Sequence, residues 1–259
     1  MSIQKNKSSW LLRFEIKPGV WIFVPDEEAK ETGEKIRKSI QNMWRPPDYY
    51  FNHQKGGHVA ALKLHTESEY FFKIDIKRFF DSINKTRVTR NLKELFGYEI
   101  ARAAASKSTV PMPNSLEKRF ILPFGFIQSP IISALCLRKS HLGNLLHKIR
   151  ENKRMKVSVY VDDIIVSSSK KHLKELTSIY FKSVYACEKS GFLLNNEKSQ
   201  KPEAYVNSFN ITTRKKSMTI NESRMAEFRK TLHETKNKFV VDGVKNYVDS
   251  INDWQSSTL

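Results

Sequence analysis

The stretch KVSVYVDDIIVSS, residues 156–168, is the most informative part of the chain. Valine recurs at every second position up to Val161, and a run of isoleucine and valine follows Asp162-Asp163. Because β-branched residues favour strands, the stretch predicts two short strands in a hairpin with both carboxylates at or near its tip. Neighbouring strand residues point to opposite faces, so the two aspartates share a site only if the tip turns between them. We therefore rank Asp162 above Asp163 as the carboxylate available for chemistry.

Another carboxylate ends a second predicted strand, because residues 71–76 read FFKIDI and place Asp75 near the strand end. A helix is predicted next, capped by Asn84 or Thr86 and ending near Gly97. The order of strand, helix and hairpin is typical of an α+β domain whose antiparallel sheet is covered by helices on one face.

The remaining elements are predicted from periodicity and from glycine and proline. Apolar spacing predicts helices that end at Arg45-Pro46-Pro47, at Gly191 and, in the C-terminal region, after Met225, Phe228 and Leu232. Gly56-Gly57 separates two short runs and predicts a hairpin. Ser129-Pro130 predicts the start of one long helix that reaches Ile149. A short strand is expected at residues 192–194.

Charge gives the first functional indication, since 45 Lys+Arg against 27 Asp+Glu leave a formal charge of +18. Such an excess suits a polyphosphate partner, and nucleic-acid binding that depends on counterion release should weaken steeply with salt. Cys136 and Cys187 lack metal or disulfide spacing, so we expect both to be reduced core residues. No apolar run is long enough for a membrane span or signal peptide, which predicts a soluble cytoplasmic protein without membrane partners.

Asp75, Asp162 and Asp163 together suggest a magnesium site. Magnesium keeps water and phosphate oxygens in most positions, so two or three aspartates from separate strands are sufficient. In nucleotidyl transfer two such ions stabilise the attacking and leaving oxygens. An Asp-Asp pair alone is usually a solvated turn, so the assignment depends on its company. His53, His58 and His65 lack metal-ligand spacing and receive no catalytic role.

That company consists of five segments in order: FFKIDIKRFFDSI, LPFGFIQSPIIS, YVDDIIV, GFLLNNEKS and AYVNSFNI. They resemble the successive palm motifs of reverse transcriptases, and the resemblance runs from about residue 70 to residue 211. It points to a bacterial enzyme near the retron and the abortive-infection or defence-associated groups. It implies a right-hand polymerase fold: N-terminal segment and fingers over 1–74, palm with interleaved fingers elements over 75–210, and a short helical thumb over 211–259.

The resemblance also implies roles for single residues. Asp75 and Asp162 match metal-binding aspartates, Asp163 matches the third catalytic carboxylate, and Lys198 matches a lysine thought to protonate pyrophosphate. Phe80 matches the aromatic that crowds the sugar of the incoming nucleotide. The remaining nucleotide-binding candidates are Ile76, Gly125, Gln128 and Lys63, and the primer-gripping segment falls on Asn207, Ser208 and Phe209.

The resemblance implies two Mg²⁺ ions, with Mn²⁺ as a possible substitute, and as partners an RNA template, a DNA product and deoxynucleoside triphosphates. The template could be a dedicated non-coding RNA used in antiphage defence, and a homo-oligomer is possible. Alternatives are an RNA-dependent RNA polymerase, against which the bulky Phe80 argues, and a catalytically inactive RNA-binding scaffold, against which the intact aspartates argue. Phe124 departs from the family, which often has glutamine there, and Val206-Asn207-Ser208 stands where a retron enzyme has Val-Thr-Gly.

Overall fold

A computed structural model describes residues 9–256 of the 259, with side chains to residue 252. The chain forms two compact units, each assembled from separated segments. Unit one contains the segment through Pro47 together with residues 77–144 and 188–193, and unit two contains residues 48–76, 145–187 and those from Leu194 onward. The fingers, palm and thumb boundaries expected from sequence stay predictions.

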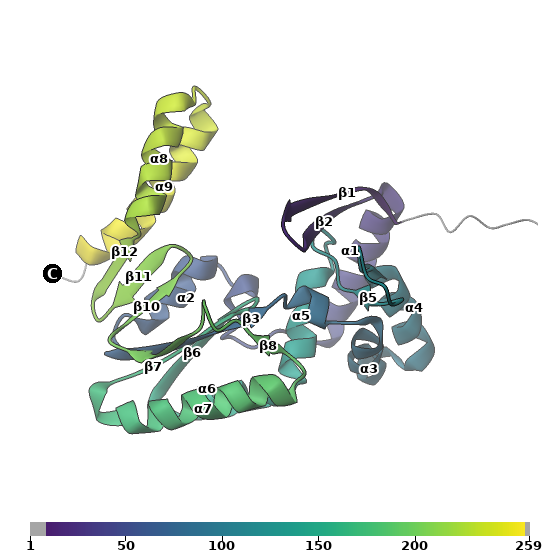
Figure 1. Cartoon of the computed structure of the whole chain (residues 1–259), viewed down its shortest axis with the longest axis horizontal. Helices are drawn as coiled ribbons and strands as arrows, with labels where there is room; N and C mark the ends of the chain where they lie inside the picture. The colour runs from purple at the N-terminus through teal and green to yellow at the C-terminus, as the bar shows by residue number, and fades with distance from the viewer. Residues whose placement is uncertain (1–8, 257–259) are drawn as a thin grey trace, which may run out of the picture. The chain divides into compact units, whose positions relative to one another are not determined.

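Unit one is a small strand and helix assembly (Figure 1). Two of its helices begin at side-chain caps: Asp26 accepts from the backbone N–H of Ala29 at 2.8 Å, and Asn84 accepts from that of Arg87 at 2.8 Å. Its main elements are β1 (Trp10–Lys17), β2 (Val20–Pro25), α1 (Glu27–Met43), α3 (Lys85–Phe96), α4 (Tyr98–Ser108), β4 (Val110–Pro111), β5 (Phe120–Ile121) and α5 (Ser129–Arg138). Phe23, Val110, Ile121 and Phe126 form a buried apolar cluster in it.

Unit two is built on an antiparallel sheet in the order β6-β7-β3-β8, with β9 also paired to β3. The sheet strands are β3 (Tyr70–Lys77), β6 (Met155–Tyr160), β7 (Asp163–Ser168), β8 (Leu193–Leu194) and β9 (Gln200–Glu203). A second sheet follows, made of β10 (Tyr205–Ser208), β11 (Ile211–Arg214) and β12 (Ser217–Ile220). The helices are α2 (Gly57–His65), α6 (His141–Glu151), α7 (Leu173–Lys189), α8 (Glu222–Glu234) and α9 (Lys238–Ser256).

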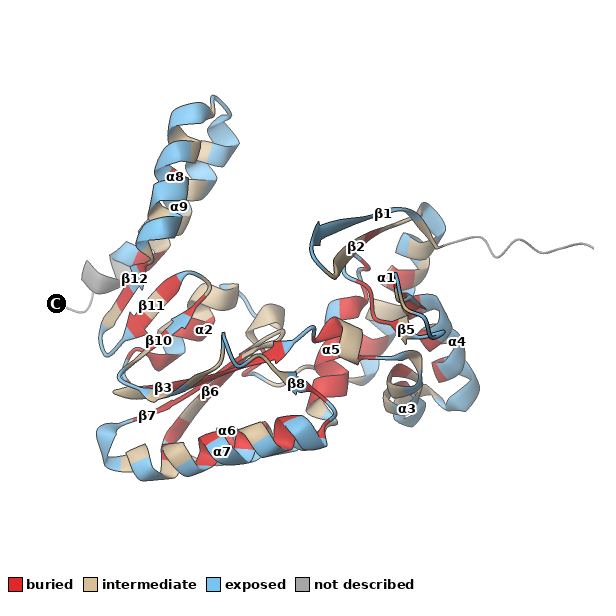
Figure 2. Ribbon diagram, viewed as in Figure 1, coloured by how far each residue is buried: buried red, intermediate tan, exposed pale blue. Residues whose placement is uncertain are grey.

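The two faces of the main sheet differ in what covers them. Helices α6 and α7 lie along one face and turn their buried sides toward it (Figures 1 and 2), where Phe72 packs on Tyr180 of α7. The opposite face carries Phe71 and Ile165 into a core shared with α2, the second sheet, α8 and α9. Since strand side chains alternate, Lys73 and Asp75 belong to the same face as Phe71. Lys73 and Asp75 therefore face away from α7.

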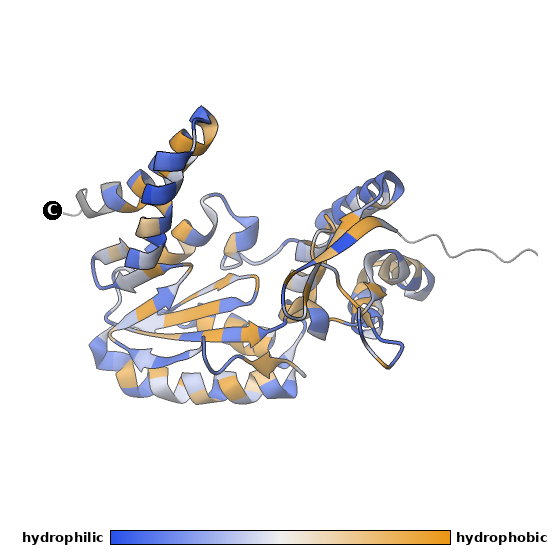
Figure 3. Cartoon of the chain, turned by 45° about the horizontal axis from the view of Figure 1, so that its top comes forward, coloured by the Kyte–Doolittle hydropathy of each residue, from blue (hydrophilic) through white to orange (hydrophobic). Residues whose placement is uncertain are grey.

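Several expectations are confirmed. The hairpin at 155–168, the helix from Asn84 to Gly97 and helix α7 all form, and Gly97 and Gly191 take left-handed φ angles of 78° and 66°. Cys136 and Cys187 are buried thiols, as expected, and burial raises their pKa values to about 12 and about 11. Along the sheet strands, apolar residues in orange alternate with paler and blue polar residues (Figure 3). No helix in the described part of the chain has a stretch long and apolar enough to cross a bilayer.

Two expectations are wrong. The segment after Gly56 is helix α2 instead of a hairpin strand, because Gly56 at φ 87° provides the left-handed entry and Ala61, Leu62 and His65 then bury one helical face. The long helix from Ser129 is two helices, α5 and α6, because the Ser140 hydroxyl accepts from Gly143 N at 3.1 Å and starts a new helix.

Candidate active site

Three carboxylates gather where β3 meets the β6–β7 turn. Asp75 lies opposite Asp163 in antiparallel register, and residues paired in this way project from the same face. The backbone N–H of Ile76 donates to the Asp162 carbonyl at 3.1 Å and ties the turn to β3. Asp75 is buried, at 6% exposure. The strand end and the hairpin tip thus form one acidic site within unit two.

The tip turns as the sequence argument requires. Tyr160 and Asp163 close the strand ladder, which leaves Val161 and Asp162 as a two-residue turn. Val161 has φ 60°, a left-handed conformation that costs a β-branched residue roughly 1–3 kcal/mol and is found mostly where function requires it. Asp162 therefore leaves the strand alternation, and adjacent aspartates can serve one site.

The acidic site is electrostatically strained. Burial, followed by the charges of Asp163 and Asp75, raises the pKa of Asp162 to about 6. Burial is also the largest cause that raises the pKa of Asp163, and the charge of Lys73 opposes it. Negative charge in this site exceeds the positive charge that the chain supplies.

Lys73 is a functional candidate that the sequence reasoning missed. Its ammonium lies 3.3 Å from Oδ1 of Asp163, and its side chain is 9% exposed. A lysine inside the otherwise apolar strand YFFKIDIK, two residues before Asp75, was the available signal, because that spacing places both on one face. Lysine is almost never buried unless paired, so the pairing explains its place.

Lys198 is carried by a short turn that is fastened to Asp75. The Asp75 carbonyl accepts from Asn195 N at 2.9 Å, and the Asp75 N–H donates to the Ser199 hydroxyl at 3.0 Å. Within the turn, Ser199 N donates to the Asn195 carbonyl at 2.8 Å. The exposed Lys198 is close enough that its charge lowers the pKa of Asp162, against the effect of burial. The predicted proton donor thus belongs to the same acidic site.

The residues fit a divalent-cation site with two protein ligands. Among the described residues no three His, Cys, Asp or Glu side chains already stand in a metal-binding arrangement. Asp163 is engaged by Lys73, which leaves Asp75 and Asp162 with charge to be neutralised. Magnesium takes one or two carboxylates and completes its shell with water and substrate phosphates, so this donor set is sufficient.

Comparison with known proteins gives the family. The family described as "Reverse transcriptase (RNA-dependent DNA polymerase)" matches residues 20–246. The chain belongs to the reverse transcriptase family.

Solved structures agree on the fold. A foamy viral protease-reverse transcriptase in complex with double-stranded DNA matches 88% of the chain at 17% identity and a TM-score of 0.50. Telomerase from Candida albicans, in complex with a fragment of telomeric RNA, matches 74% at 10% identity and a TM-score of 0.54. The chain spans only 33% and 38% of the length of those two proteins. The α+β fold expected from sequence is thereby confirmed.

The predicted nucleotide-side residues of this reverse transcriptase chain divide between the units. Phe80 belongs to unit one and is 5% exposed, with its ring centroid 4.3 Å from that of Phe124 and 6.0 Å from that of Phe79. Phe124, which departs from the family's frequent glutamine, is therefore the packing partner of the predicted sugar-excluding ring. The structure does not bring Phe80 and the aspartates into the same unit.

Gly125 and Gln128 also lie in unit one, and both have structural contacts. A side chain on Gly125, at φ 102°, would meet the Phe23 carbonyl at 2.2 Å, so strand β2 by itself requires glycine there. Gln128 is 1% exposed, and its amide donates to the Lys107 carbonyl at 3.4 Å and the Ser108 hydroxyl at 3.3 Å. Close packing within unit one accounts for these contacts, and a nucleotide role for either residue stays a prediction.

Lys63 and the primer-gripping segment lie in unit two with the aspartates. Lys63 is partly exposed on α2, and its nucleotide role stays a prediction. Strand β10 ends at Ser208, and a turn with left-handed φ at both Phe209 and Asn210 leads into β11. Phe209 packs against Tyr160, with ring centroids 5.1 Å apart, so the segment contacts the hairpin that carries Asp162.

Proposed function

We propose that this chain is an RNA-templated DNA polymerase that adds deoxynucleotides by two-metal-ion nucleotidyl transfer. The observation that carries the proposal is Asp75 facing Asp163 across β3 and β7, with Asp162 in the adjoining turn. Membership of the reverse transcriptase family supports it. An RNA template, a DNA product and deoxynucleoside triphosphates are the partners that this activity requires.

Asp75 and Asp162 would hold the Mg²⁺ ions, which Mn²⁺ could replace. When bound, these ions stabilise the attacking and leaving oxygens. Lys73 would keep Asp163 ionised and oriented, since a buried carboxylate needs a paired charge. Lys198 would donate a proton toward the departing pyrophosphate, because its charge already acts on Asp162 and its turn is fixed to Asp75.

The proposal is tested by incorporation of labelled deoxynucleotides on a primed RNA template with Mg²⁺. Asp75→Asn keeps the side-chain volume and removes a ligand charge, so we expect a loss on the order of 1000-fold. Asp242→Asn, an exposed carboxylate on α9, is the matched control and should act as wild type. Normal incorporation by Asp75→Asn would sink the assignment.

Phe80 supports deoxynucleotides over ribonucleotides, because a ring held against Phe124 resists displacement by a 2′-hydroxyl. Repacking a held side chain costs roughly 1–3 kcal/mol, which predicts at least tens-fold preference for dGTP over GTP in the wild type. Phe80→Ala should lose most of that preference, and Phe124→Ala should lose part of it. Melting temperatures must be measured alongside, since truncating a core aromatic costs about 3–5 kcal/mol. An unchanged sugar preference in Phe80→Ala would remove this argument.

The biological role that we propose is antiphage defence in the cytoplasm with a dedicated non-coding RNA as template. Its support is the resemblance of the five ordered motifs to bacterial retron and abortive-infection enzymes. RNA that co-purifies with the chain should be one species that serves as template in the incorporation assay. A strain with Asp162→Asn and Asp163→Asn should lose plaque protection, and full protection in that strain would contradict the role.

A further inference from the structure

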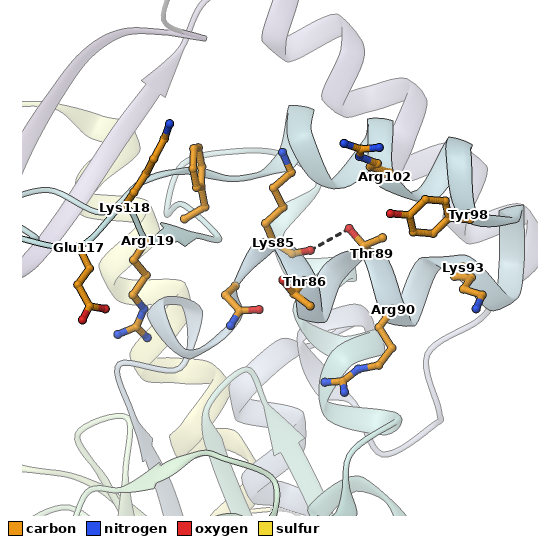
Figure 4. A pocket seen from close by; sticks show the side chains of 12 residues that line it. Lys85, Thr86, Thr89, Arg90, Lys93, Tyr98, Arg102, Glu117, Lys118 and Arg119 are labelled. Carbon is orange, nitrogen blue, oxygen red and sulfur yellow. Dashed lines mark hydrogen bonds between the residues drawn. The ribbon is translucent and has the colours of Figure 1, made fainter.

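A groove of about 670 Å³ opens on unit one between helices α3 and α4 and the segment before β5 (Figure 4). Lys118 and Arg119 lie on one side of it, and Tyr98 and Arg102 lie on the other. Six cationic side chains and one acidic side chain line it: Lys85, Arg90, Lys93, Arg102, Lys118, Arg119 and Glu117. All lie in unit one, whereas the aspartates of the acidic site lie in unit two.

The helix pattern explains how the charge is concentrated. On α3, Val88 and Leu92 are buried, while Thr86, Arg90 and Lys93 follow each other at helical spacing on the exposed face. On α4, Tyr98 and Arg102 are one turn apart. Packing of α3 on α4 thus places two polar faces side by side along the groove.

These cations lack the acidic partners that neutralise arginine side chains on other helices. Arg37 of α1 pairs with Glu34 at 2.5 Å, and Arg224 of α8 pairs with Glu227 at 2.6 Å. In the part of the chain that the structure describes, none of the six groove cations forms an ion pair, including with Glu117. Like charges one turn apart repel, so the groove has a charge excess that an anion would relieve.

Aromatic side chains interleave with the cations. Tyr98 is 52% exposed at the groove, and Phe120 already carries the Lys85 ammonium 5.5 Å from its ring centroid. A free aromatic face stacks with an unpaired base, and surrounding cations follow the phosphates of the same strand. The hydroxyls of Thr86 and Thr89 add hydrogen-bonding groups beside the cations.

We propose that this groove binds a single-stranded stretch of nucleic acid, with phosphates on Arg90, Arg102 and Lys118 and a base stacked on Tyr98. The site is additional to the acidic site, and it gives the chain a second attachment for the strand that it copies or makes. RNA and DNA single strands share this chemistry, so the probes must distinguish them.

The test measures binding of fluorescent 20-nucleotide RNA, DNA of the same sequence, and duplex RNA, without Mg²⁺ or nucleotides. The variant carries Arg90→Gln, Arg102→Gln and Lys118→Gln. The control carries Lys30→Gln, Lys38→Gln and Lys215→Gln, the same charge change at lysines paired with glutamates. Removing three phosphate contacts should lower the salt slope by about 2 and weaken single-strand binding roughly tens-fold at 0.15 M salt.

Tyr98→Ala separates the stacked base from charge alone. It should weaken single-strand binding by about tenfold and leave duplex binding unchanged, because paired bases cannot stack on the ring. A loss with either RNA or DNA supports the groove and identifies the strand. Equal affinity and salt slope in the two triple variants would overturn the proposal, as would a Tyr98→Ala effect of equal size on the duplex. Binding is read without polymerisation, so failure here is distinct from failure of the proposed activity.

Discussion

Strand β7 carries two buried polar clusters on one face, and they follow opposite rules. At one end Asp163 joins Asp75 and the adjoining Asp162, where the pKa of Asp162 is raised to about 6 by burial and like charge. At the other end Ser167 lies beside His65, which is fully buried. Like charges repel one another in the first cluster, whereas the polar groups of the second cluster are hydrogen-bonded to one another.

Hydrogen bonds stabilise the cluster around His65. The Ser167 hydroxyl donates to Ser68 at 2.8 Å, so it accepts from Nδ1 of His65 at 2.7 Å. Nε2 of His65 then accepts from Ser158 at 2.8 Å. Burial, followed by the charge of Lys156, lowers the pKa of His65 to about 3 and keeps the ring neutral. A fully paired neutral network stabilises the fold, whereas an unneutralised acidic cluster marks a site that requires a ligand.

The largest expected difference between the clusters is in catalysis. Asp162→Asn should reduce incorporation on the order of 1000-fold, because it removes a ligand charge without changing volume. Ser158→Ala, in the satisfied cluster, should leave the rate per folded molecule near that of the wild type. The measurement is single-nucleotide incorporation normalised to folded protein. Equal losses in the two variants would erase the distinction between the clusters.

The next largest effect is on stability and should come from His65. His65→Ala opens a cavity and leaves Ser158 and Ser167 without their partner, which should cost about 3 to 5 kcal/mol in urea unfolding.

A combined variant sharpens this prediction. Replacing both partners by apolar groups can be nearly neutral, so His65→Leu with Ser158→Ala and Ser167→Ala should recover much of the loss. If the free energy of unfolding of this triple variant is no higher than that of His65→Leu alone, ring packing and not hydrogen bonding determines the stability of the cluster.

The sequence predicted one cluster and missed the other for physical reasons. Asp75 and Asp162 were found because a strand end and a hairpin tip are readable from β-branched patterning. Lys73 was missed because a buried charge is recognised only together with its partner, and that partner, Asp163, lies on another strand, far away in the sequence. His65 was missed because helix α2 was expected as a hairpin strand.

The same limit applies to glycines. Gly125 was a nucleotide-binding candidate from the family resemblance, and the carbonyl of Phe23, about a hundred residues earlier in the chain, requires its missing side chain for packing. Gly56-Gly57 was expected as a hairpin turn, yet it begins a helix. Local turn chemistry fixes the backbone angle, while the approaching partner is a tertiary fact that no local pattern contains.

Removing the Asp162 charge should also stabilise the protein without metal. The pKa of Asp162 is raised from 3.8 to about 6. Its ionisation therefore lowers the free energy of unfolding, with the full effect above pH 6 and no effect below pH 3.8. Asp162→Asn should therefore gain about 2 to 3 kcal/mol in unfolding free energy at pH 7.5, and lose this advantage as pH falls toward 3.8.

Magnesium gives the control for that gain. Millimolar Mg²⁺ should raise the melting temperature of the wild type and not that of Asp162→Asn, because a bound cation relieves the same repulsion. A stability gain that is equal at pH 7.5 and pH 4 would mean that packing, and not charge, is its source.

The smallest expected effect is the pH response of His65, and its sign is opposite. Its pKa is lowered from 6.5 to about 3, so the stability that it contributes is complete above pH 6.5 and is lost as pH falls toward 3. Between pH 7.5 and 5.5 this amounts to about 1.4 kcal/mol. Asp162 partly masks it in the wild type, because protonation of that carboxylate stabilises the fold over the same interval by roughly 0.8 kcal/mol.

The masking sets the design of the experiment. Urea unfolding of Asp162→Asn at pH 7.5 and 5.5 should show the full His65 loss, and adding His65→Leu, Ser158→Ala and Ser167→Ala should flatten the response. The remaining surface carboxylates and histidines are common to both proteins and cancel in the difference. If the two proteins lose equal stability on acidification, His65 is not held neutral by the fold, and the contrast between the clusters of β7 reduces to hydrogen bonding alone.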